Sequence, residues 1–121
     1  MKGRKRNSEM VVLMTASSEE EAARIAAALL EKRLIACANL LPRIRSLYRW
    51  KGKLCDDAET LLLCKTRRDL FGSLEEEAKR LHSYEVPEII GLAVAEGSAP
   101  YLAWLRSETK TRPVKRRPLR T

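Results

Sequence analysis

The stretch that determines the first half of the fold is MVVLMTASSEEEAARIAAALL, residues 10–30. It opens with a short apolar run, 10–16, which is typical of a buried strand. Ser18 then starts a capping-box pattern with Glu21, and three successive glutamates suit the positive end of a helix dipole. Apolar residues follow at helical spacing: Ala22, Ile25, Ala26, Leu29 and Leu30. This stretch therefore predicts a strand followed by a helix over about 19–33.

A long β-hairpin is predicted next. Residues 35–50 form an extended segment interrupted at Pro42, whose missing backbone donor predicts a bend or bulge. Beyond the proline, alternation places four residues on one face: Ile44, Ser46, Tyr48 and Trp50. A turn at 51–53 leads to a return strand expected over about 58–66.

The return strand is apolar on both faces, because Leu61, Leu62 and Leu63 follow one another. An antiparallel strand of a small monomer usually shows one face to water, so this run suggests burial by a partner subunit. The residues alone leave a second explanation open, in which a helix and a neighbouring sheet cover the two faces.

The remaining segments complete the order β-α-β-β-α-β-α. An apolar stripe predicts a helix over 69–81, a loop follows over 82–87, and a strand is expected over 88–96. Ser98 caps a short final helix. This order is that of the split βαβ unit, so the predicted fold class is α+β: a ferredoxin-like antiparallel sheet with helices on one face.

The positive charge of the chain belongs to its ends. The 121 residues carry a net charge of +8, from 24 Lys and Arg against 16 Asp and Glu. All 16 acidic residues lie within 7–109, so the intervening body is slightly acidic. We expect a basic N-terminal extension over 1–8, one domain over 9–108 and a basic disordered tail over 109–121. Such tails favour nonspecific contacts with nucleic acid or acidic surfaces.

The cysteines and the apolar segments predict a cytoplasmic protein. Cys37, Cys55 and Cys64 form no C-x-x-C pair, and an odd number of thiols is typical of a reducing compartment. The apolar run 10–16 is too short for a signal peptide or a membrane span, so no membrane association is expected.

Common catalytic and nucleotide-binding motifs are missing from the sequence. There is no glycine-rich phosphate loop and no G-x-S-x-G, and the central strands lack the aromatic residues of an RNA-binding module. One polar cluster has residues suited to acid–base chemistry: Glu59, Lys65, His82, Tyr84, Glu85 and Glu88. The simpler interpretation is that these residues hold a turn and a sheet edge.

Several motifs in a fixed order resemble one family. They are LIACAN at 34–39, IRSLYRW at 44–50 followed by KGK, then Glu59, Lys65-Thr66, HSYEVPE at 82–88 and YLAW at 101–104. With these motifs the chain resembles the CutA family of divalent-cation tolerance proteins over roughly residues 9–108.

The resemblance implies a tight homotrimer, similar to the trimers of PII signalling proteins, in which the hairpin around residues 51–53 reaches neighbouring subunits. It implies a role in tolerance to copper and other divalent cations, without enzymatic activity and without a required cofactor. The copper ligands assigned in a bacterial relative map onto Met14, Leu81 and His82, so only Met14 and His82 are candidate metal ligands. A thioether with an imidazole suits cuprous copper and binds cupric ion weakly.

Two other functions stay open at this point. One is a PII-like sensor that binds a small molecule in the cleft between subunits, near Lys65, Tyr84 and Glu88. The other is an enzyme that uses Glu59, His82 or Glu85 as its acid or base.

Overall fold

A computed structural model describes residues 8–110. Its elements are β1 (Glu9–Ala16), α1 (Glu19–Glu31), β2 (Cys37–Trp50), β3 (Lys53–Arg67), a 3-10 turn (Arg68–Leu70), α2 (Phe71–Leu81), β4 (Ile89–Ala93) and α3 (Ala99–Glu108). The order β-α-β-β-α-β-α is the predicted one.

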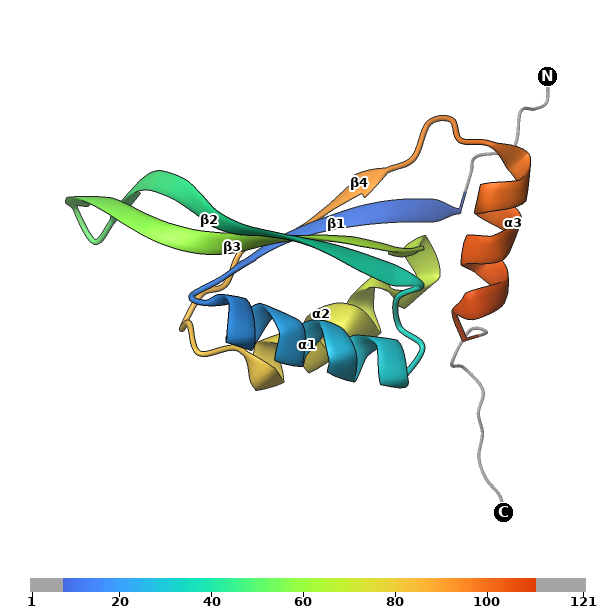
Figure 1. Ribbon diagram of the computed structural model, residues 1–121, viewed down its shortest axis with the longest axis horizontal. Coiled ribbons are helices and arrows are strands. Elements are labelled where there is room, and N and C mark those ends of the chain that lie inside the picture. The colour runs from blue at the N-terminus through green and yellow to red at the C-terminus, as the bar shows by residue number, and fades with distance from the viewer. Residues whose placement is uncertain (1–7, 111–121) are drawn as a thin grey trace, which may run out of the picture.

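The four strands form one antiparallel sheet in the order β2-β3-β1-β4. Helices α1 and α2 cover one face of it, as the ferredoxin-like prediction requires (Figure 1). Helix α3 lies apart from them, across one end of the sheet (Figure 1). There Tyr101 contacts Cys37 at 3.5 Å, and Arg106 forms an ion pair with the buried Glu9.

The core lies between the sheet and the two helices. Alternate residues of the central strands point into it and are fully buried: Val12, Met14 and Ala16 of β1, and Leu62 and Cys64 of β3. They pack on Ile25 and Leu29 of α1 and on Leu74 and Ala78 of α2. The apolar stripes predicted for both helices therefore face the core.

The hairpin has the bulge and the turn that its sequence predicts. The register of β2 against β3 shifts between Leu41 and Ile44, on either side of Pro42, and Arg43 there has a φ of 60°. Lys51 and Gly52 connect the strands with φ values of 50° and 80°. Positive φ at both central residues is the signature of a tight hairpin turn, and it explains the glycine.

Some boundaries differ from the prediction. β3 begins at Lys53 rather than near 58, because Asp56 and Asp57 pair with residues of β2 even though isolated aspartates disfavour strands. β4 ends at Ala93 rather than at 96, where its pairing with β1 stops.

The two ends of the chain lie outside the described residues, so the predicted extension and disordered tail stay predictions. The ordered body continues two residues past the predicted domain end at 108. Thr109 is buried, and the backbone N–H of Lys110 donates to the carbonyl oxygen of Arg33 at 2.9 Å.

Candidate functional site

The sheet face opposite α1 and α2, called here the open face, is apolar. Leu13 lies directly opposite Leu63 on one side and Ile90 on the other, so the three side chains share this face. Leu63 is half-buried, whereas Ile90 and the neighbouring Leu92 remain 47% and 49% exposed. Within the described chain, α3 covers only one end of the open face (Figure 1). The predicted two-sided apolar character of Leu61–Leu63 is therefore real: Leu62 faces the helices and its two neighbours face outward.

The hairpin of β2 and β3 extends beyond the helices (Figure 1). Among the described residues it carries the two most exposed of the large apolar side chains. Leu47 is 68% exposed and Leu54 is 78% exposed. Register places Tyr48 and Trp50 on the open side together with Ile44 and Ser46, which confirms the predicted alternation.

Two tyrosine–carboxylate pairs lie at the base of this hairpin. The Tyr84 hydroxyl donates to Glu59 Oε2 at 2.6 Å, and the Tyr48 hydroxyl donates to the Asp57 carboxylate. Burial and the bond to Glu59 raise the pKa of Tyr84 well above its ordinary value. The bond to Asp57 and burial raise the pKa of Tyr48 in the same direction. Both phenols are therefore neutral donors at physiological pH, and both rings are held in place by their hydroxyl groups.

These pairs border two adjoining cavities of about 470 and 340 Å³, which we call together the aromatic cavity. Both are lined by Tyr48, Trp50, Tyr84 and Val86. The larger one is also lined by Thr15, Arg45, Ser46, Leu47, Glu59 and Glu88, and the smaller one by Ser83 and Glu85.

The structure separates Lys65 from the other residues of the predicted ligand cleft. Tyr84 and Glu88 both line the aromatic cavity, whereas Lys65 lies six residues along β3 from Glu59, a distance of about 20 Å for an extended strand. Its ammonium group binds the side chain of Asn39. Within a single chain Lys65 therefore does not meet Tyr84 and Glu88, so in the predicted cleft between subunits it would come from a neighbouring chain.

His82 lies next to this cavity with its side chain fully buried. Its Nε2 lies 2.7 Å from the carbonyl oxygen of Thr15, and its Nδ1 accepts the backbone N–H of Tyr84 at 3.1 Å. Because a carbonyl oxygen only accepts, Nε2 carries the proton and Nδ1 does not. The ring also packs on Tyr84, with centroids 4.7 Å apart. Both nitrogens are thus used in joining β1 to the loop after α2.

Glu21 supports the same loop from the other side. The Ser18 hydroxyl accepts the Glu21 N–H at 3.1 Å, which is the predicted cap, but the Glu21 carboxylate binds Ser17 and not Ser18. Its second oxygen accepts the backbone N–H of Ser83 at 2.7 Å. Burial raises the pKa of Glu21, but the hydrogen bonds from Ser17 and Ser83 outweigh it and lower the pKa to about 2. The carboxylate is therefore ionised wherever the fold is intact at ordinary pH.

Comparison with known proteins identifies the family. Residues 10–108 match the sequence model of the CutA1 divalent ion tolerance protein family. The divalent-cation tolerance protein CutA of Thermus thermophilus is 52% identical over 101 residues, which are 84% of this chain and 98% of the relative. The chain belongs to the CutA1 family. The predicted resemblance is thereby confirmed over nearly the whole described body.

Solved structures of CutA1 proteins have the same fold. The Thermus thermophilus structure covers 84% of this chain and 99% of its own with a TM-score of 0.82. The rice structure, 40% identical, covers 88% of this chain and 97% of its own with a TM-score of 0.84. A third, from Archaeoglobus fulgidus, is 37% identical with a TM-score of 0.82, covers 84% and 99%, and is described as a periplasmic divalent cation tolerance protein.

In this CutA1 chain the two predicted metal ligands do not form a preformed site. Met14 is fully buried in the core, and His82 uses both ring nitrogens in hydrogen bonds. Among residues 8–110, no group of three or more histidine, cysteine, aspartate or glutamate side chains is placed to hold a metal ion. In the folded chain neither Met14 nor His82 therefore presents a free donor to a metal ion.

The three thiols are unpaired. Burial raises the pKa of Cys64 to about 12, so this thiol is inert. Cys37 is only half-buried, because its register with Lys65 places it on the open face.

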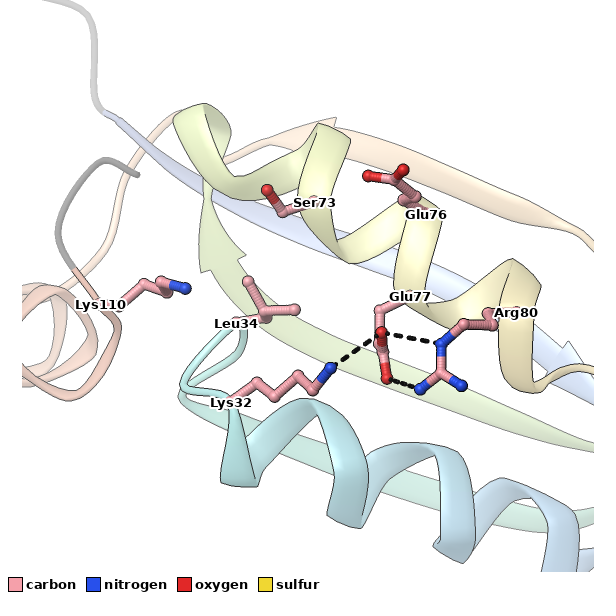
Figure 2. A pocket seen from close by; sticks show the side chains of 7 residues that line it. All are labelled: Lys32, Leu34, Ser73, Glu76, Glu77, Arg80 and Lys110. Atoms are coloured by element: carbon pink, nitrogen blue, oxygen red, sulfur yellow. Dashed lines mark hydrogen bonds and ion pairs between the residues drawn. The ribbon is translucent and has the colours of Figure 1, made fainter. Parts of the chain in front are cut away.

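Another cavity, of about 440 Å³, lies between the end of α1 and α2 (Figure 2). Glu77 accepts from Lys32 at 3.1 Å and from Arg80 at 2.6 Å, and these bonds lower the pKa of Glu77 (Figure 2). Because both cations are already paired with Glu77, we assign this network to the joining of the two helices.

Among the described residues, none of the helices has the length and the apolar character needed to cross a bilayer.

Proposed function

We propose that this chain is a homotrimeric, non-enzymatic CutA1 protein that serves tolerance to divalent metal ions, copper among them, in the cytoplasm. The observation that carries the proposal is the family match, which spans 10–108 and includes a relative named for divalent-cation tolerance. A test in cells is direct. Deletion of the gene should lower the copper concentration that arrests growth, and expression of the intact chain should raise that concentration back to its original value.

The open face supports self-association. Its apolar side chains lie uncovered on a sheet whose other face packs on α1 and α2, and the hairpin carries further exposed leucines beyond the body. Exposed apolar surface of this kind is typical of subunit contacts. Light scattering on the purified protein should give about three times the 13.8 kDa of one chain. A mass near that of a single chain would overturn the trimer.

The copper part of the proposal rests on Met14 and His82. Because neither residue is free in the folded chain, we expect weak binding that favours cuprous ion. Calorimetry with cuprous and cupric ions on the wild type and on His82→Ala tests this expectation. Equal affinities in the two proteins would remove His82 from metal binding.

A non-enzymatic role accords with the state of two of the three candidate acid–base residues, Glu59 and His82. Glu59 is held by Tyr84, and His82 is held by Thr15 and the Tyr84 backbone, so neither presents a free group to a substrate. The cytoplasmic location rests on the three unpaired thiols, and cell fractionation tests it against the periplasm named for the Archaeoglobus relative.

Binding of a small molecule is a second candidate function, which the aromatic cavity favours. Its volume is in the range of ligand pockets, and Tyr84 and Glu88 line it. Thermal-shift measurements against nucleotides, anions and amines should reveal a ligand by a rise in melting temperature, since a ligand that binds only the native state stabilises it.

A further inference from the structure

The described body begins and ends at the same end of the sheet, the end across which α3 lies (Figure 1). Its first residue, Ser8, accepts the backbone N–H of Arg68 on its carbonyl oxygen at 2.7 Å. Its last residue, Lys110, donates its backbone N–H to the carbonyl oxygen of Arg33 at 2.9 Å. An ion pair between α3 and β1 joins the two places. The segments that precede and follow the described residues therefore join the body at one end.

Two exposed arginines are held at this end by the packed body. The buried Thr66 hydroxyl donates to the carbonyl oxygen of Leu34 at 2.6 Å, which joins the end of β3 to the segment after α1. Arg33 and Arg68 lie within two residues of this bond, and both are exposed. The Arg33 guanidinium donates to the carbonyl oxygen of Ser107 at 3.1 Å, and this contact leaves its charge uncompensated.

Three basic residues at this end, Arg33, Arg68 and Lys110, are called here the basic surface. Within residues 8–110 none of the three forms an ion pair, and all are exposed. Two exposed carboxylates, Glu31 and Glu108, belong to the ends of α1 and α3. The basic surface is therefore weakly positive by itself.

The sequences that join the body here add much more positive charge. Segments 1–7 and 111–121 contain nine lysines and arginines and no aspartate or glutamate. Both segments are attached beside the basic surface, whereas the hairpin lies at the opposite end of the sheet (Figure 1). The chain therefore attaches most of its excess positive charge at one end of the body.

A nucleic acid is the polyanion that this charge fits best. Its duplex carries one phosphate charge per about 1.7 Å of axis, a density that suits closely spaced cations. Six of the nine basic residues in the two segments are arginines, whose guanidinium groups bind phosphate oxygens in pairs. The two segments contain no aromatic residue, a type that interfacial anchors use to enter a bilayer. A nucleic acid is thus favoured over a membrane.

We propose that the basic surface, together with segments 1–7 and 111–121, binds the phosphate backbone of nucleic acid without reading its sequence. The proposal goes beyond divalent-ion tolerance. It uses neither the open face nor the hairpin, because Arg33 follows α1 and Arg68 precedes α2, on the helical side of the sheet. Its failure would leave the proposed function untouched.

Fluorescence anisotropy with a short DNA duplex of arbitrary sequence tests the proposal on the full chain. The logarithm of the binding constant should fall linearly with the logarithm of the sodium chloride concentration, with a slope of about −4 or steeper. A peptide nucleic acid duplex of the same sequence, which has no phosphates, is the matched control and should not bind. Equal binding of the two duplexes would overturn the proposal. A dissociation constant above about 0.1 mM for DNA at about 50 mM salt would also overturn it.

Competition identifies the class of polyanion. Polyglutamate and phosphatidylserine vesicles, added at the same total negative charge as the duplex, should displace the chain less well than unlabelled duplex does. If either competitor displaced the chain better, the partner would be an acidic protein or a membrane, and the proposal would be wrong.

Variants locate the binding surface. Arg33→Gln/Arg68→Gln should make the salt slope shallower by about 2 and lower the affinity at least about tenfold at low salt. Arg24→Gln is the control, because Arg24 is exposed in the first half of α1 and forms no ion pair within 8–110, and it should leave the slope unchanged. Circular dichroism and light scattering confirm that each variant keeps its fold and its assembled mass.

The tail is tested separately with Lys115→Gln/Arg116→Gln/Arg117→Gln, which should make the salt slope shallower by about 3. An unchanged slope in the folded Arg33→Gln/Arg68→Gln protein would overturn the part assigned to the body. An unchanged slope in the tail variant would overturn the part assigned to segment 111–121.

Discussion

The two faces of the sheet carry similar side chains in different surroundings. On the covered face Leu62 is fully buried under α1 and α2, whereas on the open face its neighbour Leu63 is only half-buried and Ile90 is 47% exposed. A single chain thus buries only one of the two apolar faces of its sheet. The covered face determines whether the chain folds, and the open face determines what the folded chain associates with.

The largest effect should come from truncating the covered face. Leu62→Ala removes a fully buried side chain and should lower the free energy of unfolding by about 2–5 kcal/mol. Urea denaturation measures this change. Leu63→Ala is the matched control on the open face, and its cost should depend on protein concentration, since association stabilises that face. If the two variants lost the same free energy of unfolding and neither loss depended on protein concentration, the two faces would not have the separate roles in folding and association described above.

A charge on the open face should break association without unfolding the chain. Ile90→Asp places a carboxylate among apolar side chains that a neighbouring subunit would cover, and desolvation of that charge opposes assembly. Light scattering should report a mass near that of one chain, 13.8 kDa, with an unchanged circular dichroism spectrum. Ala27→Asp, on the exposed side of α1, adds the same charge and should keep the assembled mass.

Glu21 stabilises the loops at the edge of the covered face, and its effect should depend on pH. The fold lowers its pKa from 4.5 to about 2, so its contribution is complete above about pH 4.5 and is lost as the pH falls toward 2. Glu21→Gln should lower the free energy of unfolding by about 1–3 kcal/mol at pH 7.

The difference between wild type and Glu21→Gln should then shrink between pH 4.5 and pH 2. Chemical denaturation at a series of pH values gives this profile. Glu20→Gln, at an exposed neighbouring position, is the control and should show no comparable profile. A difference that stays constant down to pH 2 would show that shape rather than charge matters at position 21.

The parts of the fold that follow from local patterns could be predicted from the sequence. Helix α1, the bulge at Pro42 and the turn at Gly52 each depend on residues close together in the chain, and the structure has all three. The start of β3 was missed, since Asp56 and Asp57 join the strand only through pairing with β2. The intrinsic strand propensity of a residue carries no information about the strand with which it will pair.

The candidate site was predictable only in part, for the same reason. The alternation in β2 indicated that Tyr48 and Trp50 share a face, and this was the available signal for the aromatic cavity. Their meeting with Tyr84 depends on the loop after α2, which Glu21 and His82 hold through contacts more than 60 positions away. In one chain Lys65 lies apart from Tyr84, because residue type says nothing of position along a strand.

The smallest effect is expected on the hairpin, on the side of the sheet opposite the open face. Arg45 lowers the pKa of Asp56, as the serines lower that of Glu21, but the Arg45–Asp56 side chains are 75% and 50% exposed. Water and salt screen such a pair, so Asp56→Asn should change the free energy of unfolding far less than Glu21→Gln does. Denaturation at low salt and at molar salt tests the reason, because the small effect at Asp56 should disappear in salt while that at Glu21 persists. An effect at Asp56 as large as that at Glu21 would mean that this side of the hairpin is buried in the assembly, and the subunit contact would then extend beyond the open face.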